Sequence, residues 1–250
     1  MFQGLNRNKE AVGRVYRHTG LLVAGSIGAS LLGLLSNILA ARRLGPGSCG
    51  FLALLSTYAF SVIFGLASFE SWQALIHFGA RALAESKPDD FKGLIKAGFL
   101  LDLASALAGG TICAISLFVF ARLKGWDGAM TQVAMLFSLG IFLRLTGSST
   151  AVLRLFDRFD LLALQQVIAA GLRAACVTIV YASRAGLSAF LMVWLATEVA
   201  GAWMTTLLGI RELRKRSLRR VFRSSLRGIN SRFPGLWRFF IVSNLSPACV

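Results

Sequence analysis

Residues 20–41 read GLLVAGSIGASLLGLLSNILAA, and Arg42-Arg43-Leu44-Gly45-Pro46 follows directly. The stretch contains no charged side chain. A transmembrane helix needs about 20 mostly apolar residues to cross a hydrocarbon core of about 30 Å. The Gly-Pro pair disfavours continuation of that helix. The sequence therefore predicts a membrane-spanning helix over Gly20–Ala41 that ends in a turn.

The composition of the whole chain agrees with a membrane protein. Apolar residues make up 56% of the 250 residues and charged residues 15%, whereas a soluble domain carries about 25% charged residues. The mean hydropathy of +0.66 also excludes intrinsic disorder. The first apolar stretch is longer than the core of a signal peptide and another apolar stretch follows it. We expect it to be retained as a helix.

Five further apolar stretches of similar length follow the first. They run from about Phe51 to Ile76, Ala97 to Phe120, Ala129 to Thr150, Leu161 to Ala182 and Leu187 to Ile210. All four prolines lie outside these stretches, as expected for uninterrupted helices. The sequence predicts an all-α integral membrane protein with a six-helix transmembrane bundle over residues 20–210, preceded by a short N-terminal segment over 1–19.

The basic residues indicate how the bundle is oriented. The net charge is +16, and most of the Lys and Arg residues outside the spans fall on the side that holds the N-terminus. Cytoplasmic loops carry such an excess, so we expect a multi-pass protein with a cytoplasmic N-terminus. Contact with anionic membrane lipids explains the charge, and no nucleic acid is expected as a partner.

Two further segments are predicted after the sixth span. Residues 211–233 combine many arginines with apolar residues at helical spacing, which is typical of a basic amphipathic helix lying in the cytoplasmic interface. A disordered basic tail is the alternative. Residues 234–250 begin another apolar run that is too short to cross. We interpret this run as the start of a truncated seventh helix.

Five ionisable residues lie within or near the predicted spans: Glu70, Asp102, Arg144, Arg173 and Glu198. A charge at the bilayer centre costs at least about 2.5–3.5 kcal/mol on insertion scales, so these residues should face each other or water. Arg173 and Glu198 lie at similar distances from the turn between the last two spans, which predicts an ion pair. Arg144 is expected to attract an anion from a polar lumen. Asp102 is expected near the membrane interface. Ion pairs that only hold helices together are the alternative.

Polar uncharged residues within the spans are candidates for the lining of a polar route. They are Ser36, Asn37, Thr57, Gln132, Gln165, Gln166, Thr197 and Thr205. Enzyme signatures such as a phosphate loop, HExxH or GxSxG are absent from the sequence. The cysteines are widely separated and show no metal-binding spacing. We therefore expect no enzyme, no cofactor and no metal site.

The first hairpin resembles a known family. Residues 37–46, NILAARRLGP, and residues 50–54, GFLAL, are similar to the first hairpin of bacterial polysaccharide and O-antigen flippases. These proteins belong to the multidrug/oligosaccharidyl-lipid/polysaccharide exporter superfamily. Residues 156–160, FDRFD, and 239–245, FFIVSNL, also resemble family segments.

The resemblance implies a function in the bacterial plasma (inner) membrane. It implies two helical lobes around a cavity and alternating access that moves an undecaprenyl-pyrophosphate-linked oligosaccharide repeat unit for O-antigen, capsule or exopolysaccharide synthesis. By this resemblance Arg144 and Arg173 bind the substrate, and Glu70, Glu198 and Asp102 handle a coupling ion. A polysaccharide polymerase and chain-length proteins are implied as partners.

The family has about twice as many helices as this chain. We therefore expect a chain truncated to its N-terminal lobe, for which a homodimer would rebuild a cavity. Two alternatives remain open at this point. One is a membrane assembly or interaction subunit that does not transport, and the other is a multidrug-type ion-coupled exporter.

Overall fold

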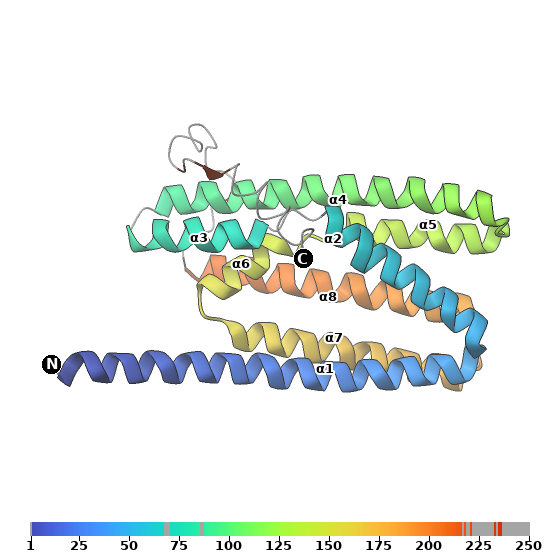
Figure 1. Ribbon diagram of the computed structural model, residues 1–250, viewed down its shortest axis with the longest axis horizontal. Helices are drawn as coiled ribbons and strands as arrows, with labels where there is room; N and C mark the ends of the chain where they lie inside the picture. Colours follow the sequence, from blue (N-terminus) through green and yellow to red (C-terminus); the bar gives the residue numbers. More distant parts are fainter. Residues whose placement is uncertain are drawn as a thin grey trace.

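The computed structural model describes residues 2–67, 71–85 and 88–216, together with Leu218, Val221, Phe233, Gly235 and Leu236. Within these residues all regular structure is helical, which confirms the predicted all-α class. Figure 1 shows long helices that lie side by side along one direction. The helices are α1 (Phe2–Thr57), the π-helix η1 (Tyr58–Ile63), α2 (Phe64–Ala67), α3 (Ser71–Ala84), α4 (Pro88–Lys124), α5 (Gly128–Phe142), α6 (Gly147–Leu155), α7 (Phe159–Ala182) and α8 (Leu187–Lys215).

Helix α1 contains the turn that the sequence predicted after the first span. Gly45 has φ 73° and ψ 174°, and Pro46 follows it. Glycine adopts a positive φ without the steric cost that a Cβ would add, and proline is well suited to the first position of a new helix. In Figure 1 the ribbon doubles back at this point. Helix α1 therefore supplies one full crossing and begins a second.

The bundle has the predicted number of crossings. Five helical segments are long and apolar enough to span a membrane: Gly20–Leu66, Asp89–Lys124, Gly128–Leu155, Phe159–Ala182 and Leu187–Lys215. The first of these has 47 residues and turns back at Gly45, so it holds two crossings. We call the end of the bundle where α1 starts and α8 ends the proximal end, and the end with Gly45 the distal end.

The second span differs from its predicted course. After Thr57 the α-helix widens into the π-helix η1, which is followed by α2, and the next described helix is α3. The prediction of an uninterrupted α-helix is therefore wrong at residues 58–63. Residues 68–70, between α2 and α3, lie outside the described residues. Glu70 lies outside the described residues, so its predicted role stays a prediction.

The fourth span is broken where the sequence predicted a continuous helix over Ala129–Thr150. Helix α5 ends at Phe142 and α6 begins at Gly147. The segment around the break reads LRLTGSST over residues 143–150. The residues of low helix propensity, Gly147 to Thr150, form the first turn of α6, whereas Leu143, Arg144 and Leu145 in the break are good helix formers. Arg144 therefore lies in an irregular segment inside the span.

Two buried apolar clusters hold the bundle together. The distal cluster includes Leu55, Phe137 and Phe190, and the proximal cluster includes Leu75 and Phe91. The outer surface is apolar as well, with large exposed side chains that would be unfavourable in water. Leu31, Ile115 and Ile179 each expose between 60% and 67% of their surface. Such a surface fits hydrocarbon, where apolar side chains carry no solvation penalty.

The segment after α8 is described only in part. Helix α8 continues as far as Lys215, so the first residues of the predicted amphipathic stretch extend the sixth span. Leu218, Val221, Phe233 and Leu236 pack in the proximal cluster. The other residues of 217–233 and of 234–250 lie outside the described part of the chain. The interfacial helix and the start of a seventh helix therefore stay predictions.

Candidate functional site

An elongated cavity of about 540 Å³ lies between α1, the α5–α6 break, α6, α7 and α8. Its wall on α7 runs from Leu162 to Arg173, which corresponds to about 16 Å at a rise of 1.5 Å per residue. On α1 it is lined by small residues, including Ala29, Ser30 and Gly33. The cavity therefore extends through the inner part of the bundle from near the proximal end.

The close approach of α1 to α7 forms one edge of this cavity. A Cβ added to Gly25 would lie 2.9 Å from the Cβ of Ala163. Since real Cβ atoms essentially never come so close, the two helices pack this tightly only with glycine at this position. On α1, Gly25 thus forms the contact with α7, whereas Ala29 and Gly33, one and two turns further along, line the cavity.

The predicted ion pair between Arg173 and Glu198 is confirmed. Arg173 Nη2 lies 2.7 Å from Glu198 Oε1, and Arg173 Nε donates to Thr197 Oγ1 at 3.0 Å. The Arg173 guanidinium also lies 5.6 Å from the ring centre of Trp194. Both charged side chains are about three-quarters buried. Arg173 is thus fixed by several contacts that link α7 to α8.

Arg144 reaches the same carboxylate from the broken span. Its Nη1 is 3.9 Å from Glu198 Oε2 and donates to the backbone oxygen of Phe60 at 3.5 Å. The guanidinium carbon lies 4.3 Å from the ring centre of Phe64 and 5.9 Å from that of Phe60. Both aromatic residues belong to the irregular second span. Two helix irregularities therefore meet at Arg144, and its contacts with polar atoms are long.

Asp102 supports the cavity from behind. Its Oδ2 accepts a hydrogen bond of 2.7 Å from the backbone nitrogen of Ser148, at the start of α6. The residue is 6% exposed, so it packs inside the bundle, and its expected depth near the membrane interface stays a prediction. A carboxylate at a helix N-terminus satisfies a free N–H group and interacts favourably with the helix dipole. Asp102 is therefore placed to stabilise the restart of the broken span, and it does not line the cavity.

Arg154 is a cavity residue that sequence reasoning missed, because it lies beyond Thr150, where the predicted fourth span ends. It lies on α6, lines the cavity, and its guanidinium carbon is 4.3 Å from the ring centre of Trp72. Its Nε is buried without a hydrogen-bond partner. Thr146, Thr150 and Arg154 all line the cavity. This spacing of four places them on one helix face, a signal that the sequence contained.

The polar lining agrees in part with prediction. Gln165, Gln166, Thr197 and Thr205 line the cavity, whereas Ser36, Asn37, Thr57 and Gln132 do not. Its charged lining residues are three arginines and one glutamate. This excess of positive charge in a partly buried space favours an anion. Among the described residues, no group of three His, Cys, Asp or Glu side chains could hold a metal ion.

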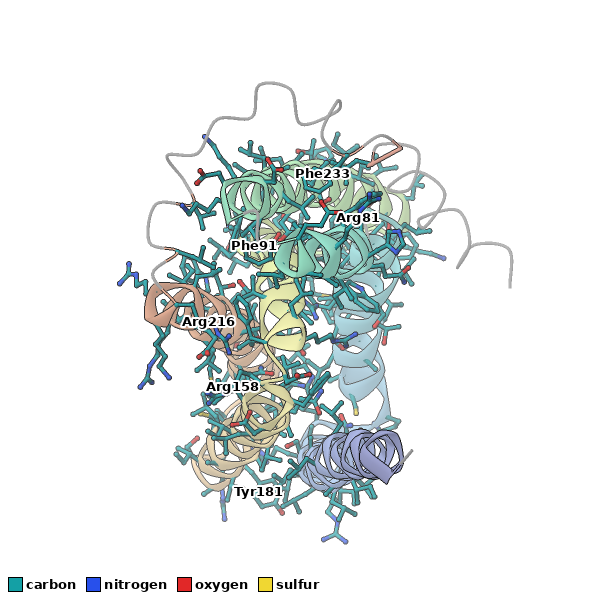
Figure 2. The ribbon with its side chains drawn as sticks, turned by 90° about the vertical axis from the view of Figure 1, so that its left-hand side faces the viewer. Arg81, Phe91, Arg158, Tyr181, Arg216 and Phe233 are labelled. Atoms are coloured by element: carbon teal, nitrogen blue, oxygen red, sulfur yellow. The ribbon has the colours of Figure 1, made fainter. Side chains whose placement is uncertain are left out.

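A second ionic cluster lies at the proximal end of the bundle. Glu212, whose side chain is 5% exposed, lies 3.8 Å from Arg158, 3.6 Å from Lys215 and 3.5 Å from Arg216. Figure 2 looks onto this end and shows Arg158 and Arg216 there. The Arg216 guanidinium also lies 4.1 Å from the ring centre of Phe156. We call these four charged residues the Glu212 ion cluster; they do not line the cavity.

Comparison with known proteins supports the membrane assignment. The chain is similar to Inner membrane protein YghQ of Escherichia coli (strain K12). The two are 29% identical over 236 residues, which cover 93% of this chain and 65% of that protein. The chain thus spans less than two thirds of the length of this curated relative. No family model matches the chain, and no solved structure matches it. Together with its spans, the similarity establishes a helical, membrane-embedded protein.

Proposed function

We propose that this chain is a transporter lobe that moves lipid-pyrophosphate-linked oligosaccharide repeat units across the bacterial inner membrane. The single observation that carries the proposal is the cavity inside the bundle, which is lined by three arginines and one glutamate and lies beside a broken helix. Broken helices that line a cavity near the membrane midplane are typical of transporters. The resemblance of the first hairpin to polysaccharide flippases supports the choice of substrate.

The chemistry of the cavity suits a phosphate-bearing headgroup. Guanidinium groups match phosphate geometry with paired N–H donors, and hydroxyl and amide groups such as those of Thr150, Gln165 and Gln166 suit a sugar. In the proposed cycle the anion competes with Glu198 for the arginines. Protonation of Glu198, or binding of a coupling cation to it, frees Arg144 for the substrate and links transport to an ion gradient.

The proposed setting is the inner membrane, which the name of the similar E. coli protein supports. A cytoplasmic N-terminus places the proximal end, with its many arginines, beside anionic headgroups. Because one lobe bounds only one side of a transport route, a second lobe or a second copy of this chain would supply the opposing wall. A polysaccharide polymerase and chain-length proteins are the proposed functional partners.

The same cavity argues against export of cationic drugs. Three arginines beside one glutamate repel a cation, so a multidrug-type exporter of cationic dyes would be poorly served by this lining. A non-transporting assembly subunit makes a different prediction, because it needs no charged cavity residue. The experiment below therefore separates the assembly role from transport.

The test is replacement of Arg144 by Ala in cells that depend on this protein for surface polysaccharide. We expect surface polysaccharide to be lost while the protein remains in the membrane at normal abundance. The matched control is Arg211→Ala, which removes the same charge from an exposed position on α8. Normal polysaccharide with Arg144→Ala would contradict transport through this cavity and favour the assembly role.

A further inference from the structure

We propose that Arg154 is an anion-binding residue and that it works together with Arg144, whereas Arg173 serves to hold Glu198. The ligand class is a phosphate or diphosphate ester, and this inference rests on the proposed function for its lipid-linked form. It changes the set of binding residues expected from the sequence, which paired Arg144 with Arg173. The three arginines differ in what already occupies their donors.

Arg173 is the cavity arginine with the closest partners within the chain. It holds Glu198 at 2.7 Å and Thr197 at 3.0 Å. An ion pair of this geometry, three-quarters buried, is costly to break because both charges would lose their partner. Arg173 therefore keeps the carboxylate in place beside Arg144. Its part in ligand binding is that of a positioning residue.

Arg154 is held over an aromatic ring. The guanidinium carbon lies 4.3 Å from the ring centre of Trp72, and a cation in this position is attracted by the ring without using its N–H donors in hydrogen bonds. Its Nε is buried and has no hydrogen-bond partner among the described residues. A buried donor without a hydrogen bond is destabilising, because it has lost its contact with water. An anion in the cavity would satisfy this donor.

The two proposed binding arginines lie at opposite ends of α6. Arg144 precedes the helix and Arg154 lies in its last turn. The helix has nine residues, which corresponds to about 13 Å, and Thr150 lines the cavity between them. Arg154 is therefore the first cation that an anion meets from the proximal end. Arg144, beside Glu198, is the deeper one.

The experiment measures binding to the full chain in nanodiscs of zwitterionic lipid. The probes are undecaprenyl diphosphate, undecaprenol as its uncharged counterpart, and inorganic pyrophosphate. We expect undecaprenyl diphosphate to bind with a Kd that rises at least tenfold in Arg154→Ala and Arg144→Ala. Arg154→Lys should recover part of the affinity, because it restores the charge without the fork of donors. Arg211→Ala should bind like the wild type.

Each outcome decides the inference. An unchanged Kd in correctly folded Arg154→Ala and Arg154→Lys would overturn it, and so would the absence of saturable binding of either phosphate probe to the wild type. Arg154-dependent binding of pyrophosphate equal to that of the lipid would support the anion site and identify a free phosphate compound as its ligand. The two experiments can also disagree. If the lipid binds in nanodiscs in a way that depends on Arg154, but cells with Arg144→Ala keep normal surface polysaccharide, the anion site is supported and the transport proposal is refuted.

Discussion

Two glutamates in this bundle are surrounded by arginines, yet their surroundings differ. Glu212 in the Glu212 ion cluster has three cations within 4 Å and does not line the cavity. Glu198 is paired closely with Arg173 and loosely with Arg144, and all three line the cavity. Lys215 and Arg216 have side chains about half exposed, whereas Arg144 and Arg173 are about three-quarters buried.

The difference indicates that the charges around Glu212 stabilise the fold, whereas those around Glu198 serve to bind a ligand. At Glu212 three cations surround one carboxylate, and two of them, Lys215 and Arg216, have side chains that are about half exposed. At Glu198 one arginine is fixed, one is loosely held, and Arg154 has a buried donor without a partner. Buried charges that are not fully paired are costly, and their presence around a cavity indicates a ligand that completes the pairing.

The largest expected difference between the two glutamates is in stability. Arg173→Ala leaves Glu198 with one partner at 3.9 Å, and we expect a loss of about 2 kcal/mol, less than the 3–5 kcal/mol of a fully buried pair. Arg158→Ala leaves Glu212 with Lys215 and Arg216, so the loss should stay below about 1 kcal/mol. Unfolding of both variants in mixed micelles measures the two losses. Equal losses of stability in the two variants would contradict the proposed difference between Glu198 and Glu212.

The second difference concerns binding of an anion. Glu198→Gln removes the internal carboxylate that competes with the ligand for Arg144, so affinity for undecaprenyl diphosphate should rise about tenfold, equivalent to about 1.4 kcal/mol. Glu212→Gln should leave this affinity unchanged, because Glu212 does not line the cavity. Titration of the lipid into nanodiscs measures both. An equal rise in affinity in the two variants would show that the net charge of the protein, and not the position of Glu198 in the cavity, determines the affinity.

The smallest difference is in the response to salt. Exposed charges are screened with a Debye length of about 10 Å at 0.1 M ionic strength, and buried pairs are screened much less. The coupling of Arg216 with Glu212, from a double-mutant cycle, should therefore fall by a few tenths of a kcal/mol between 0.05 M and 0.5 M salt. The coupling of Arg173 with Glu198 should change less. The reverse order would contradict the burial of the cavity pair.

Much of the fold could be predicted from the sequence, because length and apolarity alone define a membrane span. The turn at Gly45-Pro46 and the pair Arg173–Glu198 followed from local chemistry and from helix rise. The break at residues 143–146 did not, since Leu143, Arg144 and Leu145 are good helix formers and the residues of low helix propensity lie at the start of α6. Arg144 was expected to face a polar lumen, yet its partners on the second span depend on the π-helix η1.

The contact made by Asp102 and the place of Arg154 in the cavity were missed for one common reason. In the predicted unbroken helix, the backbone nitrogen of Ser148 would already be paired within the helix, so no contact with Asp102 was expected. The residues after Thr150 lay outside that predicted helix. Once the break is recognised, residues 146, 150 and 154 fall on one face of a short helix. The pairing of Arg154 with Trp72 remains beyond sequence reasoning, because it depends on the packing of α3 against α6.

The most direct test of the central claim is the accessibility of helix α7 to water at matched depths. Single cysteines at Gln166 and Ala170 would face the cavity, whereas cysteines at Leu164 and Ile168 would occupy exposed apolar positions. In a background without the native cysteines, a charged, membrane-impermeant thiol reagent should label the first pair in the assembled protein and leave the second pair unlabelled. Equal labelling of both pairs, or labelling of the second pair alone, would contradict a polar cavity inside this bundle.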